Sequence, residues 1–181
     1  MNFLGIIGSL RKDSYNRMLF KAFGQVLPEG VNLNEAEIAD LPLYNQDLEE
    51  DFPKSAEKLK KVIEQADGII FFTPEFNRTI PAPLKNAVDW FSRPYGKNSI
   101  AGKPVLVLGA TVGNIGTALS QYNLKQALLY LDARVLGQPE FYLSAAQDKF
   151  SADGELTDEA TKERLKKAID TFIDFVKSNR S

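Results

Sequence analysis

The stretch "DGIIFFTPEFNRTIPAPLKNAVDW", residues 67–90, decides how this chain folds. Its first eight residues, 67–74, are a short apolar run that ends in a proline, which indicates a buried β-strand. Residues 82–91 have the spacing of a short helix, and Pro81 and Pro83 open it. Proline fixes its own backbone, so the connection between strand and helix is stiff. A buried strand, a stiff loop and a helix form one unit of an α/β protein.

The same order of elements repeats along the rest of the 181 residues. We predict strands over 2–7, 31–38, 67–74, 103–110 and 134–141, and helices over 14–27, 54–66, 82–91, 117–131 and 157–177. The second strand has the weakest pattern. Residues 142–156 are the least regular stretch, and we expect a loop there. Because nothing in the sequence resembles a linker or a repeat, we expect a single domain over residues 1–181.

Strands that alternate with helices predict a parallel sheet, covered by helices on both faces and joined by right-handed crossovers. We predict a flavodoxin-like, doubly wound, five-stranded sheet with the strand order 2-1-3-4-5. Ligands bind such sheets at the carboxyl ends of the strands, where the winding reverses. The loops 8–16, 74–80 and 109–116 follow the first, third and fourth strands, and they would meet at one crevice.

The composition excludes several kinds of chemistry. The chain has no cysteine and no histidine, so disulfides, thiol nucleophiles, zinc sites and Ser-His-Asp triads are excluded. Any redox chemistry must therefore come from a bound cofactor. The formal net charge of -2 gives no reason to expect a nucleic-acid partner.

The N-terminal apolar stretch "NFLGII" has no basic residues before it, which favours a first strand over a signal peptide. No apolar run approaches the about 20 residues that a membrane-spanning helix needs. We therefore expect a soluble, cytoplasmic protein.

The first loop, "GSLRKDSYNR" at residues 8–17, suits a terminal phosphate. A helix N-terminus presents unpaired N–H groups to an anion, and Ser9, Ser14, Asn16 and Arg11 add polar and charged donors. The stretch lacks the glycine patterns G-x-G-x-x-G and G-x-x-x-x-G-K-[ST], so a monophosphate fits better than a bridging pyrophosphate. The alternative is that Asp13 or Ser14 caps the helix while Arg11 is solvated.

The second and third loops suit a planar ring. Residues 75–78 can present backbone N–H groups to a ring edge, and Phe76 can pack on the ring face; alternatively, Phe76 belongs to the core. We assign Leu84, Val88, Trp90 and Phe91 to the core or a subunit interface. The third loop, "GATVGNIG", has three glycines that permit close approach of the backbone to a ligand, although ordinary turns use glycine too.

Taken together, "GSLRKDSYN", "PEFN", "LKNAVDW" and "QYNLKQALLYLDARVLGQPEF" resemble the NAD(P)H-dependent FMN reductase family, and within it the quinone and chromate reductases. The resemblance covers almost the whole chain. It implies FMN as cofactor, with its phosphate held by Ser9, Arg11, Ser14 and Asn16, next to Tyr15. It implies Pro74, Glu75, Phe76 and Asn77 at the flavin ring, with further contacts from Ala110, Thr111 and Gly113.

The resemblance also implies an activity. FMN would accept hydride from NADH or NADPH and pass two electrons to a quinone or similar small acceptor, without a catalytic acid or base from the protein. Family members form homodimers, often homotetramers, and the helices at 84–91 and 117–131 are the expected interface. Phe76 stands where the family commonly has tyrosine, Asn123 where close relatives have histidine, and Lys125 where they have arginine.

The sequence leaves two other functions open. A flavodoxin-type electron carrier would share the fold, but such carriers are markedly acidic. A phosphoacceptor signalling domain would need an acidic cluster after the first strand, where Ser9 and Arg11 stand. The sequence leaves open whether the acceptor is a quinone, a free flavin, an azo dye or a metal oxyanion, and whether NADH or NADPH is preferred.

Overall fold

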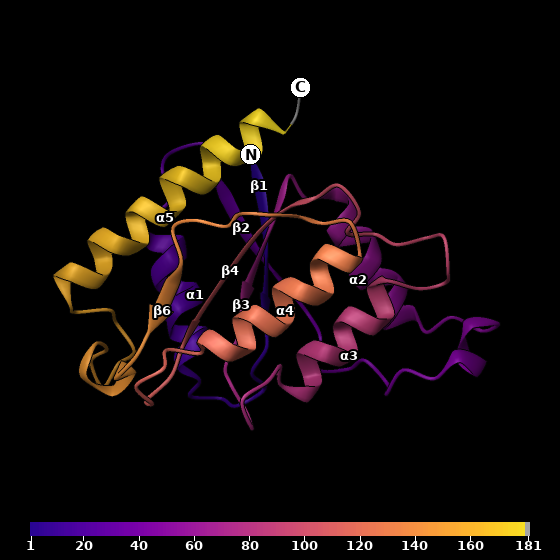
Figure 1. Cartoon of the computed structure of the whole chain (residues 1–181), viewed down its shortest axis with the longest axis horizontal. Helices are drawn as coiled ribbons and strands as arrows, with labels where there is room; N and C mark the ends of the chain where they lie inside the picture. The colour runs from indigo at the N-terminus through magenta and orange to yellow at the C-terminus, as the bar shows by residue number, and fades with distance from the viewer. Residues whose placement is uncertain (180–181) are drawn as a thin grey trace.

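A computed structural model describes residues 1–179 of the chain, which form one parallel sheet flanked by helices (Figure 1). The strands are β1 (Asn2–Ile7), β2 (Asn32–Ala36), β3 (Gly68–Phe72), β4 (Pro104–Ala110), β5 (Arg134–Val135) and β6 (Phe141–Leu143). Their order is β2-β1-β3-β4-β5, with β6 also paired to β4, and every pair is parallel. The predicted strand order and parallel sheet are confirmed.

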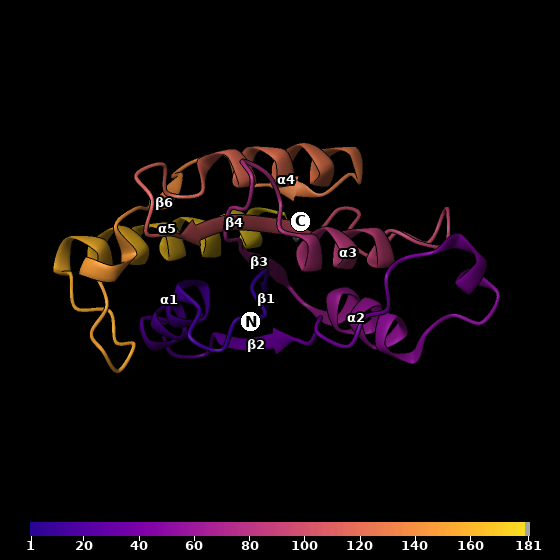
Figure 2. The ribbon, with the colours of Figure 1, turned by 90° about the horizontal axis from the view of Figure 1, so that it is seen from below.

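The helices cover both faces of this sheet, as expected for a doubly wound protein. They are α1 (Tyr15–Gln25), α2 (Lys54–Gln65), α3 (Ala82–Phe91), α4 (Ala118–Tyr130) and α5 (Glu159–Ser178), with short 3₁₀ turns η1 (Gln46–Glu49) and η2 (Ala146–Asp148). Figure 2 shows α1 and α5 on one side of the strands, with α2 and α3 on the other. Core contacts place α4 on the same face as α2 and α3.

Two hydrophobic cores lie on opposite faces of the sheet, because successive residues of each strand point to opposite sides. On the face of α1 and α5, Phe3 packs against Phe172 with ring centres 5.1 Å apart. The other core contains Leu84, Val88, Trp90 and Phe91, which are 0–4% exposed. Their assignment to the core of the chain is therefore confirmed, and burial on both faces explains the continuous apolar runs.

The fifth strand differs from the prediction, because the expected strand over 134–141 is split in two. Val135 pairs with Val105 in β5, and Phe141 pairs with Leu108 in β6, so both pieces follow the same edge of β4. The intervening residues leave the sheet at Gly137 and Pro139, and a proline cannot donate to a β-ladder. The loop predicted over 142–156 is also wrong in part, since it contains the end of β6 and η2.

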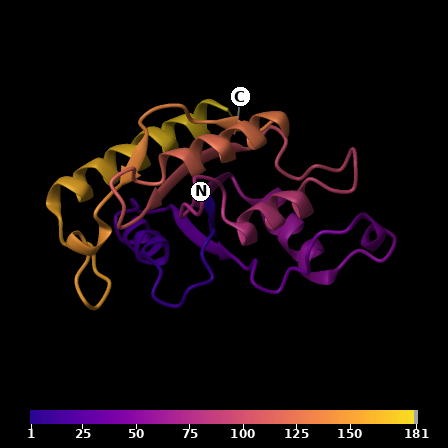
Figure 3. The same ribbon diagram turned by 60° about the horizontal axis from the view of Figure 1, so that its bottom comes forward.

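Two segments project at opposite ends of the molecule (Figure 3). Residues 37–53, which include η1, form the first projection. Its Glu49 carboxylate accepts hydrogen bonds from Arg93, which lies after α3, at 2.5 Å and from the Tyr44 hydroxyl at 2.7 Å. The bond from Arg93 and then the one from Tyr44 lower the pKa of Glu49. The second projection, between β6 and α5, is closed by a bridge between Phe150 and Leu156. None of the helices within residues 1–179 has the length and hydropathy needed to cross a membrane.

Candidate functional site

The three unusual loops meet at the carboxyl edge of the sheet and line two adjoining pockets. The smaller pocket, of about 220 Å³, is lined by Ser9, Arg11, Ser14, Tyr15, Asn16, Pro74, Glu75, Phe76, Ala110, Thr111 and Val112. The larger, of about 510 Å³, is lined by Glu75, Asn77, Arg78, Thr111, Gly113, Asn114, Ile115 and Thr117. Glu75 and Thr111 belong to both. All twelve predicted site residues therefore lie in this one crevice.

The first loop places polar groups around the start of α1. Ser14 is the N-cap of this helix, and its Oγ accepts from the backbone N–H of Asn16 at 3.2 Å, so the capping interpretation is correct for Ser14. The exposed Arg11 guanidinium donates to the carbonyl oxygen of Asp13 and lies 5.7 Å from the ring centre of Tyr15. Asp13 is exposed and is not among the residues that line either pocket.

Asn16 is a buried connection between two of the three loops. Its side chain is 2% exposed and exchanges two hydrogen bonds with the backbone of Ala110 at the end of β4. The amide donates to the Ala110 carbonyl at 2.9 Å and accepts from the Ala110 N–H at 3.0 Å. Both bonds hold the first loop against the third. The sequence placed Asn16 in the site but did not show this contact, which spans 94 residues.

The second loop is a two-residue hairpin that projects Phe76 outward. Phe76 and Thr79 exchange backbone bonds of 3.3 and 2.9 Å, and the two turn residues, Asn77 and Arg78, have φ of 48° and 63°. This is the pattern of a type I′ turn. Phe76 is 65% exposed, so the alternative that placed it in the core is wrong. Its own N–H is bonded to Thr79 and is therefore not free to face a ring edge, as the sequence interpretation expected of residues 75–78.

The Glu75 carboxylate faces the N-terminus of α4. Its side chain is only 9% exposed, and Oε2 accepts from the backbone N–H groups of Leu119 at 3.0 Å and Ser120 at 3.2 Å. Thr117, the formal N-cap, has φ of 68° and makes no side-chain cap. A carboxylate at the positive end of a helix is stabilising, so Glu75 caps α4 from a different loop. Sequence reasoning placed Glu75 at the ring and missed this role.

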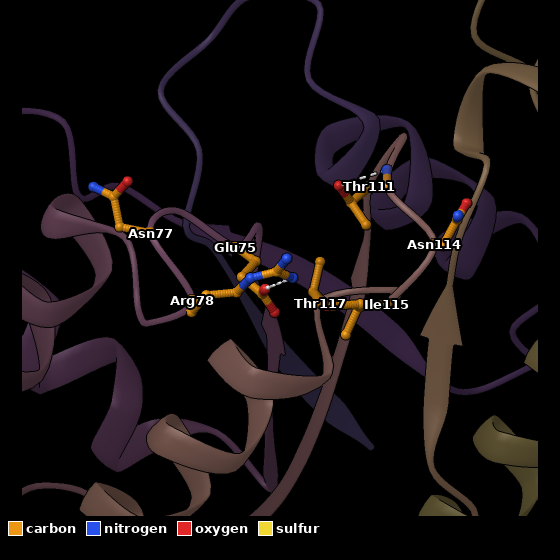
Figure 4. A pocket seen from close by; sticks show the side chains of 8 residues that line it. Glu75, Asn77, Arg78, Thr111, Asn114, Ile115 and Thr117 are labelled. Atoms are coloured by element: carbon orange, nitrogen blue, oxygen red, sulfur yellow. Dashed lines mark hydrogen bonds and ion pairs between the residues drawn. The ribbon is translucent and has the colours of Figure 1, made fainter.

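Further contacts fasten the second loop to α4. The Asn123 amide donates to the Arg78 carbonyl at 3.2 Å, and the Arg78 guanidinium lies 3.4 Å from Glu75 Oε1 (Figure 4). At the base of the crevice, Thr73 Oγ1 and Ser120 Oγ are 2.8 Å apart. A Cβ at Gly109 would come within 2.1 Å of the Thr73 carbonyl oxygen, so only glycine fits there.

Sequence reasoning also missed some of the residues that line the crevice. They are Arg78, Val112, Asn114, Ile115 and Thr117. Four of them lie within the loops 74–80 and 109–116, and Thr117 comes directly after. These residues could have been found only from their position in or directly after these loops, because their residue types alone indicate no particular ligand.

The crevice suits an elongated ligand with an anionic end and an aromatic end. Arg11, Ser9 and the N-terminus of α1 lie together at one end, while Phe76, Val112 and Ile115, exposed by 65%, 57% and 41%, supply apolar surface at the other. Glu75 is the only acidic residue that lines either pocket within residues 1–179, and its carboxylate is committed to α4. A phosphate donor set beside apolar surface fits FMN. No cluster of three potential metal ligands occurs within residues 1–179.

The fold and this crevice together define a flavodoxin-like protein with a site for a phosphorylated aromatic cofactor. Comparison with known proteins narrows the class. The family model of NADPH-dependent FMN reductases matches residues 1–148. The chain therefore belongs to the NADPH-dependent FMN reductase family, and it is an FMN-dependent NAD(P)H oxidoreductase.

Three similar proteins carry related names. The chain is 39% identical to a 2-hydroxy-1,4-benzoquinone reductase of Burkholderia sp, over 97% of this chain and 96% of the relative. It is 41% identical to a quinone reductase of Escherichia coli (strain K12), over 94% and 93%. The structure of the flavoenzyme NAD(P)H:(acceptor) oxidoreductase of Paracoccus denitrificans superposes with a TM-score of 0.92, at 40% identity and 98% coverage of both chains.

Proposed function

We propose that this chain transfers two electrons from NADH or NADPH, through FMN, to a quinone. The observation that carries the proposal is the joint crevice of the three loops, which has Arg11 and the serines of the first loop at one end and exposed apolar surface at the other. The names of the quinone reductases to which the chain is about 40% identical support the choice of acceptor. We place one FMN site in each chain and treat residues 1–181 as a single domain.

We assign the cofactor phosphate to Ser9, Arg11 and Ser14, with Tyr15 beside them. Asn16 acts through Ala110, whose backbone it holds in place. The ring end of the crevice is formed by Pro74, Glu75, Phe76 and Asn77 from the second loop and by Ala110, Thr111 and Gly113 from the third.

FMN, when bound, supplies the hydride chemistry, so the protein's own residues bind, orient and limit access. No side chain of the crevice is assigned as a general acid or base. The 65% exposure of Phe76 leaves the ring end open to solvent, and both substrates can therefore use it in turn.

We propose a homodimer, which can assemble further into a homotetramer, with α4 at its interface. The outward side of α4 carries Leu119, Tyr122, Leu129 and Tyr130, which are 41–85% exposed. Exposed apolar side chains gathered on one side of a helix often mark a contact with another protein chain. The expected contribution from 84–91 is weaker, because the large apolar side chains of α3 are already buried in the chain's own core. We place the enzyme in the cytoplasm, where NADH and NADPH are available.

Steady-state kinetics of the FMN-loaded protein test the proposed reaction. With NADPH and a benzoquinone varied together, the double-reciprocal plots should be parallel, since both substrates use one open site alternately. Chromate and free FMN serve as alternative acceptors, and comparison of their kcat/KM values with that of the quinone gives the acceptor preference. If NAD(P)H is oxidised no faster than by free FMN, while a one-electron protein donor reduces the flavin rapidly, the electron-carrier interpretation is correct instead.

Light scattering tests the assembly. The wild-type protein at micromolar concentration should have at least twice the mass of one chain, and Leu129→Glu should reduce it to that of a monomer. A wild-type protein that is monomeric and fully active would contradict the proposed interface.

A further inference from the structure

Arg78 occupies a backbone position that favours glycine. It is the second residue of the hairpin turn at 76–79, with φ of 63°, and turns of this type prefer Asn-Gly at their two central positions. Asn77 matches this preference, but Arg78 does not. A non-glycine residue in the left-handed region is strained, and such strain is characteristic of functional sites. Glycine could form the same turn, so the guanidinium of Arg78 calls for an explanation.

The guanidinium lies at the rim of the larger pocket and is largely unused. The Arg78 side chain is 66% exposed, and its contact with Glu75, at 3.4 Å, is long. Figure 4 shows it extended toward Glu75, opposite Thr111 and Asn114 across the pocket. A guanidinium has five N–H donors in a fork that matches phosphate oxygens. Most of this capacity therefore remains for a ligand.

The two arginines of the crevice line different pockets, which indicates different roles. Arg11 lines the smaller pocket with the serines of the first loop, and it faces the FMN phosphate in our assignment. Arg78 is the one cationic side chain that lines the larger pocket within residues 1–179. A nicotinamide dinucleotide must bring its ring to the exposed end of the crevice, and it carries a pyrophosphate with it.

We propose that Arg78 binds a phosphate group of the NADH or NADPH donor. This inference rests on the proposed function, because it requires the donor to enter at the ring end of the crevice. Arg78 is then a binding residue for the donor only. The quinone, which has no phosphate, does not use it, so this arginine separates the recognition of the two substrates.

Arg78→Gly in the FMN-loaded enzyme tests the proposal. Glycine suits the left-handed turn and keeps the backbone carbonyl that Asn123 binds, so the hairpin stays intact. The KM for NADH and NADPH should rise about tenfold, as expected for the loss of a charge-assisted contact that is partly exposed. The maximal rate should change less than twofold, and the KM for the quinone should stay constant. Arg78→Lys should fall between wild type and glycine.

Two controls distinguish recognition of a phosphate by Arg78 from a general effect of the protein's net charge. Lys61→Gln removes one exposed positive charge from α2, outside the crevice, and should leave every KM unchanged. N-benzyl-1,4-dihydronicotinamide is a donor without phosphate, so Arg78→Gly should lower the rate ratio of NADPH to this donor about tenfold. In calorimetry, the affinity of the oxidised enzyme for NADP⁺ should fall by a similar factor.

The two dinucleotides identify which phosphate is bound. Equal losses for NADH and NADPH indicate the pyrophosphate, whereas a loss for NADPH alone, matched by weaker binding of 2′,5′-ADP, indicates the 2′-phosphate. Unchanged KM values and unchanged NADP⁺ affinity in Arg78→Gly would overturn the proposal. That result differs from a failure of the proposed function, in which the wild-type enzyme itself would not oxidise NAD(P)H.

Discussion

The two ends of the crevice are built differently. At the first loop, Ser14 and Asn16 are 3% and 2% exposed, and their side chains bond to backbone groups of the chain. At the second loop, Phe76 and the Arg78 side chain are 65% and 66% exposed, on a turn with two left-handed residues. One end is therefore a fixed anchor, and the other is an open surface held at a few points. This arrangement suits a cofactor that stays bound while two substrates alternate.

The largest effect is expected from Asn16→Ala, which removes the buried bonds behind the anchor. The N–H and carbonyl of Ala110 would lose their partner, and each unsatisfied buried group costs about 1–3 kcal/mol. The two groups together cost about 2–6 kcal/mol. At roughly 2–4 °C per kcal/mol for a chain of this size, the melting temperature of the apoprotein should fall by about 4–24 °C. Calorimetry of the apoprotein measures it.

Asn34→Ala is the matched control, because Asn34 is an exposed asparagine on β2, away from the crevice. It should change the melting temperature by less than about 2 °C. Similar melting temperatures for the two variants would show that the anchor is not held by Asn16.

Arg11→Ala tests the phosphate end of the crevice by its effect on FMN affinity. Loss of a charge-assisted bond, worth about 1.5–3 kcal/mol, should weaken FMN binding about ten- to a hundredfold. The apoprotein should melt at nearly the same temperature, since the exposed Arg11 supports no core packing. Riboflavin lacks the phosphate and should bind both proteins equally, as followed by flavin fluorescence. Unchanged FMN affinity would mean that Arg11 is only a solvated cation.

Glu75→Ala tests whether the open end depends on α4. Removing an N-cap costs about 0.5–2 kcal/mol, so the melting temperature should fall by about 1–8 °C. Because the same carboxylate holds the ring loop, FMN affinity should also fall by a few-fold. A lower melting temperature with unchanged FMN affinity would show that Glu75 supports the helix without positioning the loop.

Asp158→Ala provides the comparison for Glu75, because Asp158 caps α5 within its own first turn. Bonds from Thr161 and then Lys149 lower the pKa of Asp158 to about 2. Since this pKa lies below the ordinary value of 3.8, the contribution of the cap is present above about pH 4 and is lost as the pH falls toward 2. At neutral pH, Asp158→Ala should lower the melting temperature by a few degrees without changing FMN affinity.

The smallest effect is expected from Phe76→Tyr. The substitution keeps the aromatic face and adds one hydroxyl at an exposed position, so FMN binding should change less than twofold. The ratio of kcat/KM between a polar and an apolar quinone should shift instead. Loss of bound flavin on this change would contradict an open ring end.

Much of this arrangement could be predicted from the sequence. The apolar runs located β1, β3 and β4, and a weaker pattern located β2. The parallel order of a doubly wound sheet then brought the three loops together. Local patterns carry such information, because burial and periodicity are properties of neighbouring residues. The prediction of one fifth strand over 134–141 was wrong for the same reason. The apolar pattern continues across Pro139, where the chain leaves the sheet.

Contacts over long sequence distances could not be predicted. Nothing near Asn16 indicates that its amide will meet Ala110, and nothing near Glu75 indicates that it will cap a helix 44 residues away. Apolar composition alone also could not separate α3 from α4. Both helices are rich in apolar residues, yet α3 buries its large side chains in the core and α4 exposes Leu129 and Tyr130.

The split edge of the sheet bears on how this protein avoids aggregation. An exposed edge strand is a template on which a foreign strand can add and begin a fibril. Here the edge beside β4 offers only the two residues of β5 and the three of β6, so an incoming strand finds no continuous ladder. At the opposite edge, Glu35 of β2 forms an ion pair with Arg17 at 2.8 Å, and charge discourages pairing there. Both margins of the sheet thus disfavour the addition of a foreign strand.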